Sequence, residues 1–249
     1  MGIWEACREA VVPSRHEGEL LRMVESQEQV ATRELVDDLA EQALLEQLLE
    51  RSKPPLPAEA ARLDYLLASP FRYPPLNYGS RFGTRFEPSL FYGALDLAAV
   101  LAETAYYRLV FWSGMIEPPP AGRLSTEHTL FAARFVTDRG LSLHLAPCDE
   151  HRDRLTNPKS YRETQQLGGE MRAAGVELFI YRSARDPEGG LNIGLFNAAP
   201  FTLPSPLWKQ AWLCDTREET VSFYSKSRGM FVYQRELFLV RGELPAPPD

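Results

Sequence analysis

Residues 79–103 read GSRFGTRFEPSLFYGALDLAAVLAE, and this stretch combines a turn, a strand and the start of a helix. The turn is basic and contains glycine, with arginines at Arg81 and Arg85. The short apolar run that follows ends in Tyr92 and predicts a strand over residues 90–93. The stretch therefore places a cation and an aromatic hydroxyl within a few residues of each other.

Small and apolar residues then predict a helix over residues 95–112. Asp96 lies in its first turn, where a carboxylate complements the helix dipole. Glu103 is a lone carboxylate among apolar neighbours, so we expect it to be partly buried. The helix thus brings a carboxylate toward the preceding turn and strand.

The chain before this stretch is expected to be largely helical. Leucines and alanines at helical spacing predict a helix over residues 32–51, with Thr32 as its cap. A second helix is expected over residues 57–69 and is ended by Pro70. We also expect a short strand at residues 20–24. We interpret residues 1–70 as an N-terminal helical extension that packs on the core, with residues 71–249 as the main domain. The alternative for the helices is a pair that binds a partner.

The chain after residue 112 predicts a sheet. A hairpin is expected from strands at 129–136 and 141–145, joined by a turn at 137–140. A helix is expected over 158–174, capped by Asn157, with a break allowed at its Gly168-Gly169 pair. Further strands are expected at 176–181, 191–196, 208–213, 221–224 and 231–238. Together, these expected helices and strands predict an α+β domain with a mixed or antiparallel sheet and flanking helices.

Composition narrows the class of protein. The 249 residues carry 27 Lys and Arg against 34 Asp and Glu, a formal net charge of -7. This balance argues against direct nucleic-acid binding, which needs a basic surface. The three cysteines, Cys7, Cys148 and Cys214, are far apart and indicate a reducing compartment. With no signal pattern and no long apolar run, we expect a cytoplasmic protein that does not enter a membrane.

The sequence lacks the glycine-rich phosphate loops and the nucleophile elbow of common enzyme classes. Cys148 and His151 are three residues apart, but two ligands do not make a zinc site. We therefore expect no metal and no prosthetic group, and any chemistry is expected to use arginine, tyrosine, serine and carboxylate side chains.

Those residue types suit cleavage of an N-glycosidic bond in a dinucleotide. An arginine such as Arg81 binds phosphate oxygens through paired N–H groups. Tyr92 offers a flat face for a ring, and Ser183 a hydroxyl for a ribose or phosphate oxygen. Glu103 can stabilise the positive charge that develops on the sugar. Each residue also has an ordinary explanation: a surface ion pair, a core tyrosine, a solvated carboxylate and a turn serine.

Three short motifs resemble the RES-domain family, which is named for an arginine, a glutamate and a serine. They read G-S-R-F at 79–82, L-F-Y-G at 90–93 and A-x-x-L-A-E at 98–103. The serine follows in I-Y-R-S-A-R at 180–185, and Asn192 precedes an apolar strand. The front end, through residue 55, is similar to the longer members of the family.

The resemblance implies a fold similar to the ADP-ribosyltransferase toxins and an enzyme that consumes NAD. Members are toxins of bacterial toxin–antitoxin pairs whose antitoxin carries a Xre-like helix-turn-helix. They cleave the nicotinamide bond by phosphorolysis or hydrolysis, with NAD as substrate and inorganic phosphate as a candidate co-substrate. Some members are assigned protein ADP-ribosylation instead.

By motif, the resemblance gives catalytic roles to Arg81 and Glu103. Arg81 would bind the NAD phosphates or the attacking phosphate, and Tyr92 would pack on nicotinamide or its ribose. Glu103 would stabilise the oxocarbenium-like state, and Ser183 would hold a phosphate or ribose oxygen. Arg85 and Arg185 are weaker phosphate candidates.

The chain departs from the family pattern in two ways. About 70 residues precede the arginine motif, a length that suffices for a small subdomain. That extension could cover the pocket, form a homo-oligomer or replace an antitoxin contact. The residues after Arg81 are also Phe82-Gly83, where many members have a tryptophan and an asparagine. A non-catalytic binding protein on the same fold is the alternative from another class.

Overall fold

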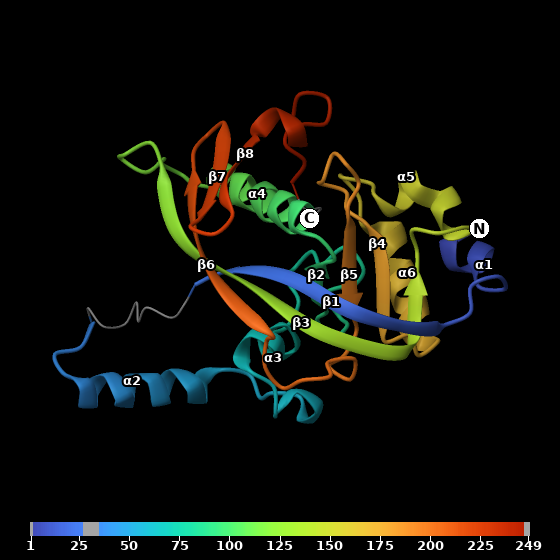
Figure 1. Cartoon of the computed structure of the whole chain (residues 1–249), viewed down its shortest axis with the longest axis horizontal. Helices are drawn as coiled ribbons and strands as arrows, with labels where there is room; N and C mark the ends of the chain where they lie inside the picture. The colour runs from blue at the N-terminus through green and yellow to red at the C-terminus, as the bar shows by residue number, and fades with distance from the viewer. Residues whose placement is uncertain (1, 27–34, 247–249) are drawn as a thin grey trace.

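The computed structural model describes residues 2–26 and 35–246, in which strands form one eight-stranded sheet (Figure 1). Its spatial order is β1-β2-β5-β4-β3-β6-β7-β8. Every neighbouring pair is antiparallel except β3 and β4. The strands are β1 (Ser14–Glu25), β2 (Phe91–Ala94), β3 (Leu124–Ser142), β4 (Leu178–Arg182), β5 (Leu191–Leu195), β6 (Trp208–Thr216), β7 (Thr220–Ser225) and β8 (Gly229–Gln234).

Strand β1 also pairs with β3 along most of its length, so the hydrogen-bonded ladder returns on itself through β1, β2, β5, β4 and β3. This mixed sheet, with helices beside it, confirms the predicted α+β class. The helices are α1 (Ile3–Cys7), α2 (Leu39–Ser52), α3 (Tyr65–Arg72), α4 (Leu97–Ser113), α5 (Arg152–Leu155) and α6 (Arg162–Ala173), with short 3-10 turns at Ala58–Ala60, Cys148–His151 and Arg235–Phe238.

Helices cover two different parts of the sheet (Figure 1). Helix α4 packs against β1, β2, β5, β6 and β7. Helices α1, α5 and α6 gather beside the end of β4. The motif residues come from the segment that precedes β2, from β2, from α4 and from the segment that follows β4, as described below.

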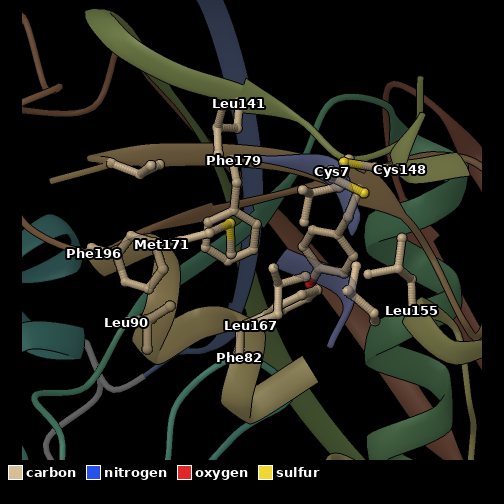
Figure 2. Packing of buried hydrophobic residues seen from close by; sticks show 14 residues of the cluster. Cys7, Phe82, Leu90, Leu141, Cys148, Leu155, Leu167, Met171, Phe179 and Phe196 are labelled. Carbon is tan, nitrogen blue, oxygen red and sulfur yellow. The ribbon is translucent and has the colours of Figure 1, made fainter. Parts of the chain in front are cut away.

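An aromatic cluster fixes the turn that precedes β2 (Figure 2). Phe82 is fully buried, and its ring centroid lies 4.6 Å from that of Phe179 and 4.8 Å from that of Tyr181. Leu167 and Met171 of α6 belong to the same cluster. Burying a phenylalanine contributes about 1.5–3 kcal/mol, so Phe82 anchors the turn between α6 and the sheet.

The predicted hairpin at 129–136 and 141–145 is wrong, because β3 runs without a break from Leu124 to Ser142. The expected turn residues are held extended by neighbours on both edges. Thr137 pairs with His16 of β1, and Gly140 pairs with both Ser14 and Leu178. Gly140 serves close packing rather than a turn, since a Cβ there would lie 2.4 Å from the His16 ring.

The N-terminal segment differs from the expected helical cover. Thr32 lies outside the described residues, and α2 begins at Leu39, capped by Asp38, whose carboxylate accepts from two backbone N–H groups. Helix α2 has no buried residue, so its expected packing on the core is not observed. The strand expected at 20–24 is longer and forms part of the sheet as β1. The division at residue 70 stays a prediction.

Two helices differ from their predicted bounds. The helix expected at 57–69 is a 3-10 turn followed by α3, which continues past Pro70 to Arg72. The helix expected at 158–174 begins at Arg162, and Asn157 caps the preceding turn instead, accepting from Lys159 and Ser160. Helix α6 does not break at its glycine pair. Gly168 lets it approach the turn closely, since a Cβ there would lie 1.8 Å from the Phe82 carbonyl oxygen.

Candidate active site

Arg81 lies in the turn between α3 and β2, and its side chain is held from the direction of α5 and α6. Its Nη1 donates to the carbonyl oxygens of Asn157 at 2.9 Å and Leu155 at 3.3 Å. Its guanidinium carbon lies 4.7 Å from the centre of the Tyr161 ring. No carboxylate in the described ranges forms an ion pair with Arg81. Arg81 is thus a positioned cation with N–H groups left for a ligand.

Tyr92 supports this turn from β2. Its hydroxyl oxygen accepts from the Phe82 backbone N–H at 3.1 Å and lies 2.9 Å from Ser80 Oγ. Burial raises the pKa of Tyr92 to about 12, so the phenol stays protonated at neutral pH. The tyrosine that the sequence predicts as a ligand contact therefore also braces the segment on both sides of Arg81.

Glu103 projects from the second turn of α4, whose start is fixed to the sheet by Asp96. Asp96 Oδ1 accepts from Ala99 N at 2.7 Å, and its Oδ2 accepts from Leu191 N at 3.3 Å. One carboxylate therefore caps the helix and ties it to β5. This double contact sets the position of Glu103 relative to the strands.

Ser183 and Asn192 hold the Glu103 carboxylate. Ser183 Oγ and Asn192 Nδ2 each donate to Glu103 Oε1 at 2.6 Å. Ser183 Oγ also accepts from the backbone N–H groups of Arg185 and Asp186, each at 3.0 Å. With both acceptor sites of this hydroxyl occupied, its proton is directed to Glu103. Glu103 Oε2 has no hydrogen-bond partner among the residues that the structure describes, and it is the oxygen left for a ligand.

A cavity of about 450 Å³ lies between these elements. Arg81, Tyr92 and Glu103 all line it, together with Asn192 and Arg185. Its volume is in the range of small-molecule sites. The structure therefore brings together the arginine, tyrosine and glutamate that the sequence singled out, with Ser183 directly behind the glutamate.

The two weaker phosphate candidates, Arg185 and Arg85, have different surroundings in the structure. Arg185 is buried, its Nη2 donates to the Pro158 carbonyl at 3.2 Å, and its guanidinium carbon lies 3.6 Å from the centre of the Tyr106 ring. Arg85 is exposed, stacks on the equally exposed Phe86 and does not line the cavity. Arg185 thus adds positive charge to the cavity, and Arg85 does not.

Aromatic rings form much of the remaining wall, namely those of Tyr78, Tyr107, Tyr161 and Tyr181. Burial, with a further contribution from Glu103, raises the pKa of Tyr181 well above its usual value. This phenol is neutral at physiological pH and offers a ring face and a hydroxyl. A flat heteroaromatic group, a sugar and an anion could therefore each find a matching surface.

Sequence reasoning did not assign roles to Asn192, to Arg22 or to the tyrosines other than Tyr92. Asn192 had been noted only as a residue before an apolar strand. Arg22 lines the cavity from β1, and the available signal was a lone charge inside the run LLRMV at residues 20–24. The tyrosines carried no distinguishing spacing.

Within ranges 2–26 and 35–246, no group of three or more His, Cys, Asp or Glu side chains is arranged to hold a metal ion. All three cysteines are buried and unbridged. In the same part of the chain, no helix has both the length and the apolar character needed to cross a membrane.

The chain was also compared with models of protein families. The family model described as the RES domain matches residues 56–216, which is well over half of the chain. This range includes Arg81, Tyr92, Glu103 and Ser183. The comparison with curated protein sequences gave no match.

Proposed function

Because this chain belongs to the RES-domain family, we propose that it is an NAD-degrading enzyme that cleaves the bond between nicotinamide and its ribose. The observation that carries this proposal is that Glu103 and Arg81 line one cavity, and neither forms an ion pair with another residue that the structure describes. Family membership brings with it an ADP-ribosyltransferase-like α+β fold, and this resemblance supports NAD as the proposed substrate.

In the proposed reaction, the bond between the ribose C1′ and the nicotinamide nitrogen breaks. The nitrogen takes the electron pair, and nicotinamide leaves as a neutral molecule because it was a pyridinium in NAD. The sugar carbon becomes cationic, and Glu103 Oε2 stabilises that charge. An oxygen of inorganic phosphate, or of water that then loses a proton, forms the new bond to C1′.

The other residues have supporting roles in this proposal. Arg81, with Arg185 lining the same cavity, binds phosphate oxygens of NAD or of the attacking phosphate. Tyr92 holds the turn and contributes its ring to the wall. Ser183 and Asn192 orient Glu103; the hydrogen bonds favour this positioning role for Ser183 over direct contact with a ligand oxygen.

The test is to incubate the purified protein with NAD, with and without inorganic phosphate, and to identify the products. ADP-ribose-1″-phosphate indicates phosphorolysis, free ADP-ribose indicates hydrolysis, and ADP-ribose attached to protein indicates the transferase alternative. The Glu103→Gln variant, purified in the same way, controls for contaminating enzymes. Intact NAD in every reaction would contradict the proposal and favour a non-catalytic binding protein.

We propose in addition that the enzyme acts in the cytoplasm as a toxin with a Xre-like antitoxin as its partner. Arrest of bacterial growth on expression, relieved by Glu103→Gln, is the expected result. Growth arrest that persists with Glu103→Gln would separate toxicity from NAD cleavage.

A further inference from the structure

A second cavity, of about 400 Å³, adjoins the candidate active site. The two cavities share six lining residues: Arg22, Leu76, Gly79, Ser80, Leu90 and Tyr92. These residues come from β1, from β2 and from the segment that leads into β2. The second cavity is therefore a neighbouring compartment across a common wall.

Arg22 projects from β1 into that common wall. Its Nη1 donates to the Tyr92 carbonyl oxygen at 2.5 Å, and its guanidinium carbon lies 4.8 Å from the centre of the Phe91 ring. Its Nε is buried and has no hydrogen-bond partner among the residues that the structure describes. Burial lowers the pKa of Arg22 to about 10, so the group is still a cation at neutral pH.

No carboxylate pairs with Arg22 in the part of the chain that the structure describes, whereas two other largely buried arginines, Arg108 and Arg72, each have such a partner. Arg108 pairs with Glu25 at 2.8 Å, and Arg72 pairs with Glu50 at 2.6 Å. A sheltered cation without a counter-charge is costly. Arg22 is therefore placed to accept an anion that comes from outside the chain.

The second cavity has the composition of a site for a flat ring system with polar edges. Tyr65 and Tyr73 contribute aromatic rings, and prolines and leucines contribute apolar surface. Hydroxyls are supplied by Ser69 and Ser89. Each cavity alone has the size of a small-molecule site, and a dinucleotide consists of two such ligands joined through phosphates.

We propose that the second cavity binds the purine-nucleotide half of the dinucleotide substrate, and that Arg22 binds the phosphates that cross the common wall. This inference rests on the proposed cleavage of NAD, because it assigns the nicotinamide half to the cavity of Glu103. It also adds to that function a specificity for dinucleotides, since the second cavity and Arg22 contact only the part of NAD that does not react.

The test compares two inhibitors of NAD cleavage. Nicotinamide is expected to occupy the Glu103 cavity, and AMP the second cavity together with Arg22. Two variants address the second site: Arg22→Met removes the charge, and Ser69→Trp fills a cavity that does not include Glu103 or Arg81. For both, we expect the inhibition constant of AMP and the KM for NAD to rise about tenfold or more, as for loss of a charged hydrogen bond. The inhibition constant of nicotinamide should stay within about twofold.

Arg15→Met is the matched control, because Arg15 is an exposed arginine on the same strand and should change neither constant. Thermal unfolding of each variant checks its folding, and the two variants lie on different elements. The inference is overturned if AMP does not inhibit the parent protein, if AMP inhibits the variants as strongly, or if both inhibition constants rise together. A parent protein that leaves NAD intact refutes the proposed function itself, and that result is visible before any variant is compared.

Discussion

The two walls of the candidate active site hold opposite charges by opposite means. On the helix wall, Glu103 Oε1 is bound by two neutral donors, each at 2.6 Å. On the turn wall, Arg81 is bound by backbone carbonyl oxygens at 2.9 and 3.3 Å. The two groups form no ion pair with each other, and both line the same cavity. The comparison teaches that the fold fixes both groups while leaving their charges for a ligand that is cationic at one end and anionic at the other.

Replacing Glu103 by glutamine removes the charge of the helix wall and has the largest expected effect. Glutamine keeps the shape but removes the negative charge that stabilises the sugar cation. We expect kcat for NAD cleavage to fall by about 10²–10³, the magnitude typical of a lost electrostatic contact in a transition state. Steady-state kinetics measures it, with Glu127→Gln, an exposed glutamate on β3, as the control. A Glu103→Gln enzyme with unchanged kcat would remove Glu103 from the mechanism.

Replacing Arg81 by methionine removes the positive charge of the turn wall. Because Arg81 is proposed to bind phosphate in the substrate, we expect kcat/KM for NAD to fall about 10- to 100-fold, mostly through KM. Arg81→Lys should recover little, since lysine lacks the planar paired donors. Arg85→Met is a close control: it lies four residues away on the same turn but is exposed and outside the cavity. Equal losses for the two arginines would indicate a general electrostatic effect rather than a contact.

The parts of this site that are positioned by residues nearby in the sequence could be predicted, and the parts that depend on distant residues could not. Arg81, Tyr92 and Glu103 come from one stretch whose turn, strand and helix are set by nearby residues, and each element forms close to where it was expected. Their direct supports were harder to find. Apart from the family motif, Ser183 was visible only as a serine at the end of a strand, and its bond to Glu103 depends on how the end of β4 lies relative to α4.

Arg22 shows why the remainder could not be predicted. It reaches the cavity because β1 joins the sheet beside β2 at the single pairing of Leu21 with Ala94. A second long-range pairing of β1, the one with β3, explains the failed hairpin, since it holds Thr137 in an extended strand that local residues would have turned. Pairing between residues so far apart in the chain leaves no local pattern in the sequence.

Replacing Ser183 by alanine tests how the Glu103 carboxylate is held in position on the helix wall. The serine hydroxyl donates to Glu103 and does not line the Glu103 cavity, so its loss should misplace the carboxylate rather than weaken substrate binding. We expect kcat to fall about tenfold with KM nearly unchanged. Ser225→Ala is the control, as another buried serine whose hydroxyl contacts Ser227.

A double variant decides whether Ser183 acts through Glu103. If it does, Glu103→Gln with Ser183→Ala should be about as slow as Glu103→Gln alone, because the two effects are coupled. Additive losses would instead support the direct contact between Ser183 and a ligand oxygen that the sequence predicts.

Replacing Tyr92 by phenylalanine tests how the turn that carries Arg81 is held in place, and it has the smallest expected effect. The change removes the oxygen that accepts from Phe82 N, and it leaves that N–H without its acceptor. We expect the free energy of unfolding to fall by about 1–3 kcal/mol, with the midpoint of urea denaturation shifted and its slope unchanged. Tyr233→Phe is the control, because no hydrogen bond of its hydroxyl is found among the described residues, and it should change stability by less than about 0.5 kcal/mol. The contrary result is a Tyr92→Phe protein with normal stability but a raised KM for NAD. It would mean that the hydroxyl binds substrate, and that the Phe82 ring alone fixes the turn that carries Arg81.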